Sequence, residues 1–70
     1  MKEVKAIMAG VVLMIPVSQG EQVSVGQEVI ILESMKMAIP IESSEKGEVS
    51  EIRVAVGDFV NEGDVLMVLK

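Results

Sequence analysis

Apolar and polar residues follow one another in short stretches along this chain, and the stretches have the length of strands. Residues 39–42 and 49–54 alternate with a period of two, which is typical of strands with one buried face. The runs 29–32 and 65–69 are apolar throughout, which is typical of strands covered on both faces. No stretch combines a helical period with capping residues at both ends. The pattern therefore predicts an all-β protein, with strands near residues 2–7, 11–17, 22–24, 28–33, 39–44, 48–54, 59–61 and 65–70.

The second half of the chain repeats the first half at an offset of 37 residues, without a gap. Residues 1–33 and 38–70 share eight identical positions, and three of these are pairs of glycines. Only residues 34–37 lie between the halves. Two similar halves predict a pseudo-twofold fold, with the junction at one end of the molecule and both chain termini near the other.

The equal spacing inside the two halves also predicts that no loop is inserted in one of them. Segments 17–26 and 54–63 have the same length, which leaves no room for a protruding thumb loop. The closely spaced glycines in both segments suit tight turns that need a positive φ. Pro16 and Pro40 fall inside predicted strands, and a proline cannot donate to the ladder of a sheet. We therefore expect each proline at a sheet edge or at the end of a strand.

The composition of the chain argues against several kinds of site and partner. Seventy residues make a single domain, residues 1–70, and the absence of cysteine and histidine leaves no disulfide framework or soft-metal site to propose. The net charge of −5, with six scattered basic residues, argues against a nucleic-acid surface. No apolar run approaches the length of a membrane span, and the first residues lack the apolar segment of a signal peptide. We therefore expect a cytoplasmic, monomeric protein that binds neither nucleic acid nor membrane.

The junction between the halves holds Lys36, in the run Glu33-Ser34-Met35-Lys36-Met37. If the flanking strands pair, Met35 and Lys36 form the centre of a two-residue hairpin turn. Such turns need positive φ at both central residues and favour Asn-Gly or Gly-Gly. A methionine and a lysine there strain the backbone by about 1 kcal/mol or more each, so the turn indicates a functional display of the amine. The plain alternative is a solvated lysine between two core methionines.

The run resembles the biotin-attachment motif of biotinyl domains, most often written E-A-M-K-M, with Ser34 as a small-for-small departure from alanine. The repeat and its turns, including Val56-Gly57-Asp58 and Asn61-Glu62-Gly63-Asp64, are similar to that family over nearly the whole chain. Length and motif are nearest to the small free-standing bacterial biotin/lipoyl attachment proteins. The resemblance implies a flattened β-barrel, or sandwich, of two four-stranded antiparallel sheets with the lysine on an exposed hairpin.

The same resemblance implies a role for each motif residue. Lys36 would form an amide with the carboxylate of biotin, through a biotin protein ligase and a biotinyl-adenylate. Because a solvated lysine is protonated at neutral pH, activation of the amine would come from the ligase. Met35 and Met37 would contact partner proteins, unless one of them is tucked against the end of the sandwich. Glu33 would help in ligase recognition or would simply be a solvated strand end.

The chain is then expected to be a non-catalytic biotin carboxyl carrier, which moves a carboxyl group from a biotin carboxylase to a carboxyltransferase, with an acyl-CoA as the acceptor. One rival is a lipoyl domain of a 2-oxo acid dehydrogenase or glycine-cleavage system. Such domains typically carry Asp-Lys-Ala, so the two methionines favour biotin, although acceptance of both biotin and lipoate stays open. A second rival is an unmodified structural module like the hairpin domains of membrane-fusion adaptors, which lack the motif lysine.

Overall fold

The computed structural model describes all residues, 1–70, as eight strands in two four-stranded antiparallel sheets. The strands are β1 (Lys2–Lys5), β2 (Gly10–Met14), β3 (Gln22–Val23), β4 (Glu28–Ser34), β5 (Met37–Glu42), β6 (Gly47–Ile52), β7 (Phe59–Val60) and β8 (Val65–Leu69). One sheet has the order β1-β8-β6-β3 and the other β5-β4-β2-β7. The molecule is elongated, 31 × 19 × 18 Å, and the predicted all-β architecture is confirmed.

The two halves of the chain are interleaved, because each sheet contains strands from both. The offset of 37 residues carries β1 to β5, β2 to β6, β3 to β7 and β4 to β8, so it exchanges the two sheets. Backbone hydrogen bonds follow the same rule. The N–H of Val12 donates to the carbonyl oxygen of Asp58 at 2.8 Å, and the equivalent Val49 N–H donates to that of Glu21 at 2.9 Å. The predicted pseudo-twofold relation is thus confirmed.

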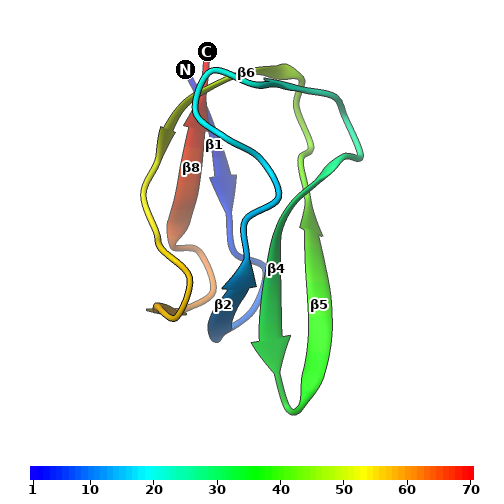
Figure 1. The fold of residues 1–70 in the computed structure, drawn as a ribbon, viewed down its shortest axis with the longest axis vertical. Coiled ribbons are helices and arrows are strands. Elements are labelled where there is room, and N and C mark those ends of the chain that lie inside the picture. The colour runs from blue at the N-terminus through cyan, green and yellow to red at the C-terminus, as the bar shows by residue number, and fades with distance from the viewer.

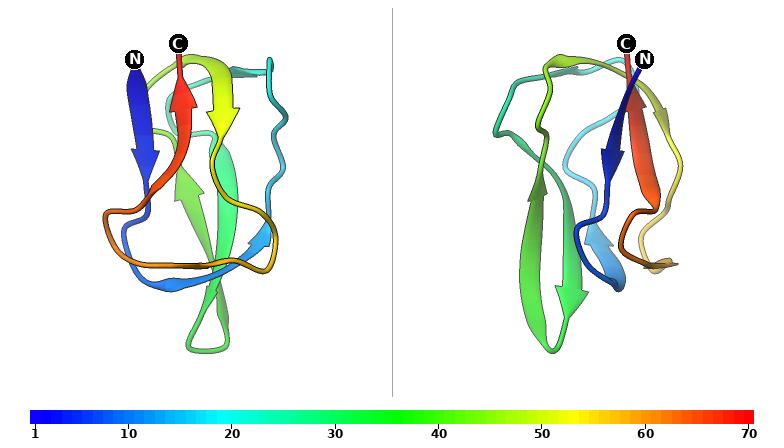
Figure 2. Two further views of the ribbon diagram at one scale, coloured as in Figure 1. Left: turned by 90° about the vertical axis from the view of Figure 1, so that its left-hand side faces the viewer. Right: turned by 180° about the vertical axis from the view of Figure 1, so that it is seen from behind.

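The turns between strands also match in pairs. The carboxylate of Glu21 accepts the N–H three residues before it at 3.0 Å, and that of Asp58 accepts the equivalent N–H at 2.9 Å. Gly20 and Gly57 precede these acids with φ of 90° and 97°, a conformation that residues with a Cβ rarely adopt. Neither half has a loop without a counterpart, so the absence of a thumb is confirmed. Figures 1 and 2 show the β4–β5 hairpin at one end of the long axis and both termini at the other, as expected.

The core lies between the sheets and is almost entirely aliphatic. The central strands β4 and β8 supply most of it. The apolar run of β8 is buried on both faces, as predicted, whereas in β4 Ile31 is only half-buried on the outer side of the sheet. The fully buried side chains of the two strands are Val29, Ile30, Leu32, Leu66, Met67 and Leu69. Phe59, the only aromatic residue of the chain, is not part of this core, because 64% of it is exposed on β7.

Several strand boundaries differ from the sequence prediction. β2 ends at Met14 rather than near residue 17, and Pro16 lies exposed beyond it. β6 also ends before the predicted residue 54, at Ile52, but it runs one residue further than β2. The N–H of Arg53, just beyond β6, donates to the carbonyl oxygen of Leu66 at 2.9 Å. Pro16 occupies the position equivalent to Arg53 and has no N–H to donate. β5 begins at Met37, earlier than predicted, and Pro40 lies on this edge strand, as expected.

Candidate functional site

The β4–β5 hairpin carries the motif lysine on a two-residue turn. Ser34 pairs with Met37, and the ladder continues through Glu33 opposite Ala38. Met35 and Lys36 close the turn with φ of 52° and 64°. They are the only residues other than glycine with positive φ in the protein, which confirms the strained turn expected from the sequence.

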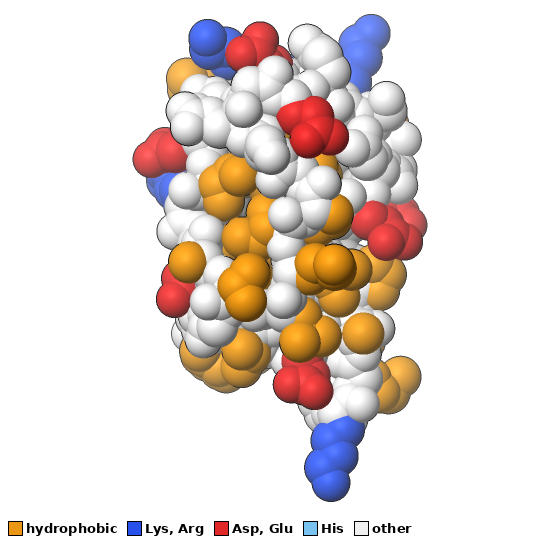
Figure 3. All heavy atoms as spheres, viewed as in Figure 1, with side chains coloured by type: hydrophobic (Ala, Val, Ile, Leu, Met, Phe, Trp, Pro, Cys, Tyr) orange, Lys and Arg blue, Asp and Glu red, His pale blue; other side chains and the backbone are white.

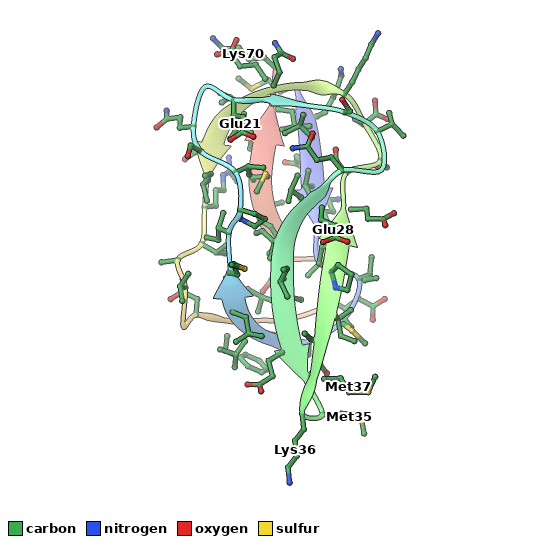
Figure 4. The ribbon with its side chains drawn as sticks, turned by 45° about the vertical axis from the view of Figure 1, so that its right-hand side comes forward. Glu21, Glu28, Met35, Lys36, Met37 and Lys70 are labelled. Atoms are coloured by element: carbon green, nitrogen blue, oxygen red, sulfur yellow. The ribbon has the colours of Figure 1, made fainter.

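Lys36 projects from the tip of the molecule into solvent. In Figure 4 its side chain points away from the body along the long axis of the hairpin. The two ion pairs of the structure join Lys5 with Glu3 and Arg53 with Glu51, so the amine of Lys36 is held by neither. A covalently attached group therefore fits here, because the amine has no competing partner and no side chain covers it.

Met35 and Met37 lie on either side of Lys36 and are both exposed, by 91% and 62%. Figure 4 shows both side chains on the same side of the turn. The alternative in which one of them is tucked against the end of the sandwich is therefore wrong. Two exposed, flexible thioethers beside the exposed amine form a small apolar surface that a partner protein can contact.

The two residues before the turn differ in environment. Ser34 is half-buried, and Glu33 is exposed on the outer side of β4. Leu32, next to them, is fully buried in the core and fixes the end of the hairpin to the body. The structure brings all five motif residues together at one end of the molecule, as their adjacency in the sequence requires.

A residue that the sequence reading did not single out, Gly10, supports the hairpin from β2. A Cβ at this position would lie 2.7 Å from the carbonyl oxygen of Glu33, which is closer than van der Waals contact. Gly10 therefore allows β2 to approach β4 immediately beside the motif. Its repeat partner, Gly47, makes the same close approach to the carbonyl oxygen of Lys70. The identity of glycines at positions 10 and 47 was the available signal for this contact.

The structure contains no pocket, and no three acidic side chains converge as metal ligands would. No helix is present that is long and apolar enough to cross a membrane. The exposed lysine hairpin is the feature of the molecule that offers chemistry.

Comparison with known proteins identifies what this arrangement is similar to. The family described as biotin-requiring enzyme, Biotin_lipoyl, matches residues 2–69. The biotin/lipoyl attachment protein of Bacillus subtilis is 55% identical over 62 residues, which are 89% of this chain and 85% of that protein. The biotinylated protein TB7.3 homolog of Mycobacterium leprae is 40% identical over 68 residues, 97% and 96% of the two chains. The structure of Kluyveromyces lactis urea carboxylase matches with a TM-score of 0.92 and 28% identity, over 99% of this chain and 6% of that one.

Proposed function

Since the chain belongs to the biotin/lipoyl family, we propose that it is a biotin carboxyl carrier and that Lys36 is the residue to which biotin is attached. The observation that carries the proposal is the unpaired amine on the strained, exposed turn between the two repeats. The similarity to an attachment protein and to a biotinylated protein over most of their lengths supports biotin as the group.

Attachment makes Lys36 a nucleophile toward an activated carboxylate. The Nζ atom, once it has lost a proton to a base of the ligase, attacks the carbonyl carbon of biotinyl-adenylate. An amide bond forms, the bond from that carbon to the phosphate oxygen breaks, and AMP leaves with the electron pair. The hairpin contributes position rather than acid–base chemistry, because no carboxylate pairs with Nζ. Met35 and Met37 are proposed as ligase contacts, with Ser34 and Glu33 shaping the strand end behind them.

The chain then acts as a carrier and not as a catalyst. Biotin, when bound, takes up a carboxyl group at a biotin carboxylase and gives it up at a carboxyltransferase. The protein supplies a rigid body that keeps the attachment point exposed and raises the effective concentration of the group at both active sites. The acceptor is proposed to be an acyl-CoA. The close structural match to a urea carboxylase indicates that the carrier fold itself does not determine the acceptor.

Lipoate is the second candidate group, because the family includes both kinds of attachment. The methionines on both sides of Lys36 favour biotin. Both lysine adducts would occupy the same exposed amine, so the position of the site does not depend on the choice.

The test is the intact mass of the protein after co-expression with a biotin protein ligase. We expect an increase of one biotin, located on Lys36 by peptide mapping. The control is Lys36→Arg, which keeps charge and exposure but replaces the amine by a guanidinium that stays protonated. Exposed substitutions of this kind change stability by about 0.5 kcal/mol at most, so melting should be unchanged while the streptavidin signal disappears. Biotin on the arginine variant would assign the attachment to another lysine.

A further inference from the structure

The sheet that carries the hairpin has an apolar outer surface. Strand pairing places Val11, Phe59 and Glu33 in one cross-strand row, and Met14 opposite Ile31 in the next. Ala38 and Pro40 extend these two rows on β5. We name this surface the hairpin face; it consists of Val11, Met14, Ile31, Glu33, Ala38, Pro40 and Phe59. In Figure 3 apolar side chains gather over the middle and lower parts of the molecule, down to the hairpin.

The fold does not require this surface to be apolar, as the equivalent positions on the other sheet show. The equivalent row on the other sheet pairs Gln22 with Glu48, in place of Phe59 with Val11. In the next row Glu3 and Glu51 flank Val68, in place of Pro40 and Met14 flanking Ile31. The same backbone thus tolerates polar side chains at these positions. The apolar side chains of the hairpin face therefore have a reason other than folding.

Phe59 is the clearest example of an apolar side chain that the core does not use. The only aromatic residue of the protein is 64% exposed, although the core is otherwise the place for such a side chain. Met14 is also exposed, by 53%. Aromatic residues and methionine are enriched at protein interfaces, and single aromatic side chains often dominate their binding energy. Exposed apolar groups that cluster on one face mark an interaction surface.

The charges around the hairpin face indicate the chemistry of the partner. The four strands of this sheet carry Glu28, Glu33 and Glu42 and no lysine or arginine. The other sheet mixes both signs, with Lys2 and Lys5 beside its acidic residues. The surface therefore complements an apolar patch bordered by basic groups.

The hairpin face lies beside Lys36, and this position favours one of the three proposed partners: the ligase, the biotin carboxylase or the carboxyltransferase. Before modification, the amine reaches only as far as its own four-carbon stem from the turn. A protein that acts on the unmodified amine must therefore approach the hairpin and the sheet behind it closely. A protein that acts on the attached group is spared this approach, because the group lengthens the arm.

We propose that the hairpin face is the surface on which the biotin protein ligase docks, through a ligase patch that is apolar and bordered by lysine or arginine. This inference rests on the proposed function. It adds that recognition extends from Met35 and Met37 across the outer side of the sheet to Phe59, beyond the motif itself.

The test is the rate of Lys36 labelling by a purified biotin protein ligase with ATP, Mg²⁺ and biotin, at varied carrier concentration. The double variant Phe59→Gln with Met14→Gln replaces the two most exposed large apolar side chains of the face by polar groups, as the other sheet has them. The control, Val25→Gln, removes an apolar side chain that is 66% exposed but lies in a turn at the far end from the hairpin. Melting curves first verify that all variants fold, and the two single variants replace the double variant if it does not.

We expect the KM for the double variant to rise by about tenfold or more with kcat within about twofold, and Val25→Gln to match the wild type. Added salt should raise the wild-type KM, because carboxylates border the face. Labelling of all proteins with the same KM would overturn the docking surface and leave the proposed function intact. An unlabelled wild type would overturn both. A wild-type dimer in sedimentation that dissociates in the double variant would assign the face to a second copy of this chain and overturn the ligase assignment.

Discussion

Substituting Gly10 on β2 by alanine should displace the adjacent strand β4 and, with it, the β4–β5 hairpin. The new Cβ would lie 2.7 Å from the carbonyl oxygen of Glu33, about 0.7 Å inside ordinary contact at 3.4 Å. The atom it meets belongs to the backbone of β4, so the strand itself must retreat. Overpacking of this kind typically costs 1–3 kcal/mol, and the loss of unfolded-state freedom from glycine to alanine offsets about 0.4–1 kcal/mol of it.

The net cost of about 1–2 kcal/mol lowers the melting temperature by about 10 °C for a domain of this size. The retreat of β4 also moves Lys36, and a misplacement of about 1 Å costs roughly a hundredfold in rate when reacting groups must meet. We therefore expect ligase-catalysed labelling of Gly10→Ala to slow by about tenfold or more. The assay is a time course of biotin incorporation at a temperature well below both melting transitions, so that only folded protein is compared.

Gly47→Ala is the matched control, because its Cβ meets the carbonyl oxygen of Lys70 in the same way at the end opposite the hairpin. It should be destabilised to a similar degree and labelled at the wild-type rate. Equal labelling rates for Gly10→Ala and Gly47→Ala would refute the reasoning, because the position of the hairpin would then not depend on the contact behind it.

Two further predictions concern the turn itself. The double variants Met35→Lys with Lys36→Met and Met37→Lys with Lys36→Met move the lysine by one residue. They should fold but should not be labelled efficiently, since a shift of one residue redirects the side chain. Labelling rates comparable to that of the wild type would mean that the ligase recognises a flexible peptide. Met35→Asn should raise the free energy of unfolding by about 1 kcal/mol, because asparagine tolerates the left-handed conformation better than methionine. Thermal melting measures this gain, and an unchanged melting temperature would contradict the assigned strain.

The sequence by itself determined the strands, the repeat and the chemistry of the turn. Short-range steric preferences decide these features, because valine and isoleucine favour extended backbone and glycine permits the positive φ of tight turns. The same steric preferences identified the two strained positions of the turn. Met35 and Lys36 stood where asparagine and glycine are expected, and the structure confirms positive φ at both. Lys36 is also distinguished by its place, because it lies in the only segment without a counterpart in the repeat.

Only the tertiary structure decided which strands pair and which sides face water. The two halves share the apolar positions that become the core, so each could pair within itself or with the other, and local preferences do not distinguish these arrangements. Packing of the complete core resolves the choice, with β1 beside β8 and β2 beside β7. The outward side of each strand follows from that pairing. A continuous apolar stretch such as Phe59-Val60 does not state which side will be covered. The exposure of Phe59 and the close approach of Gly10 to Glu33 therefore follow only from the assembled sheets.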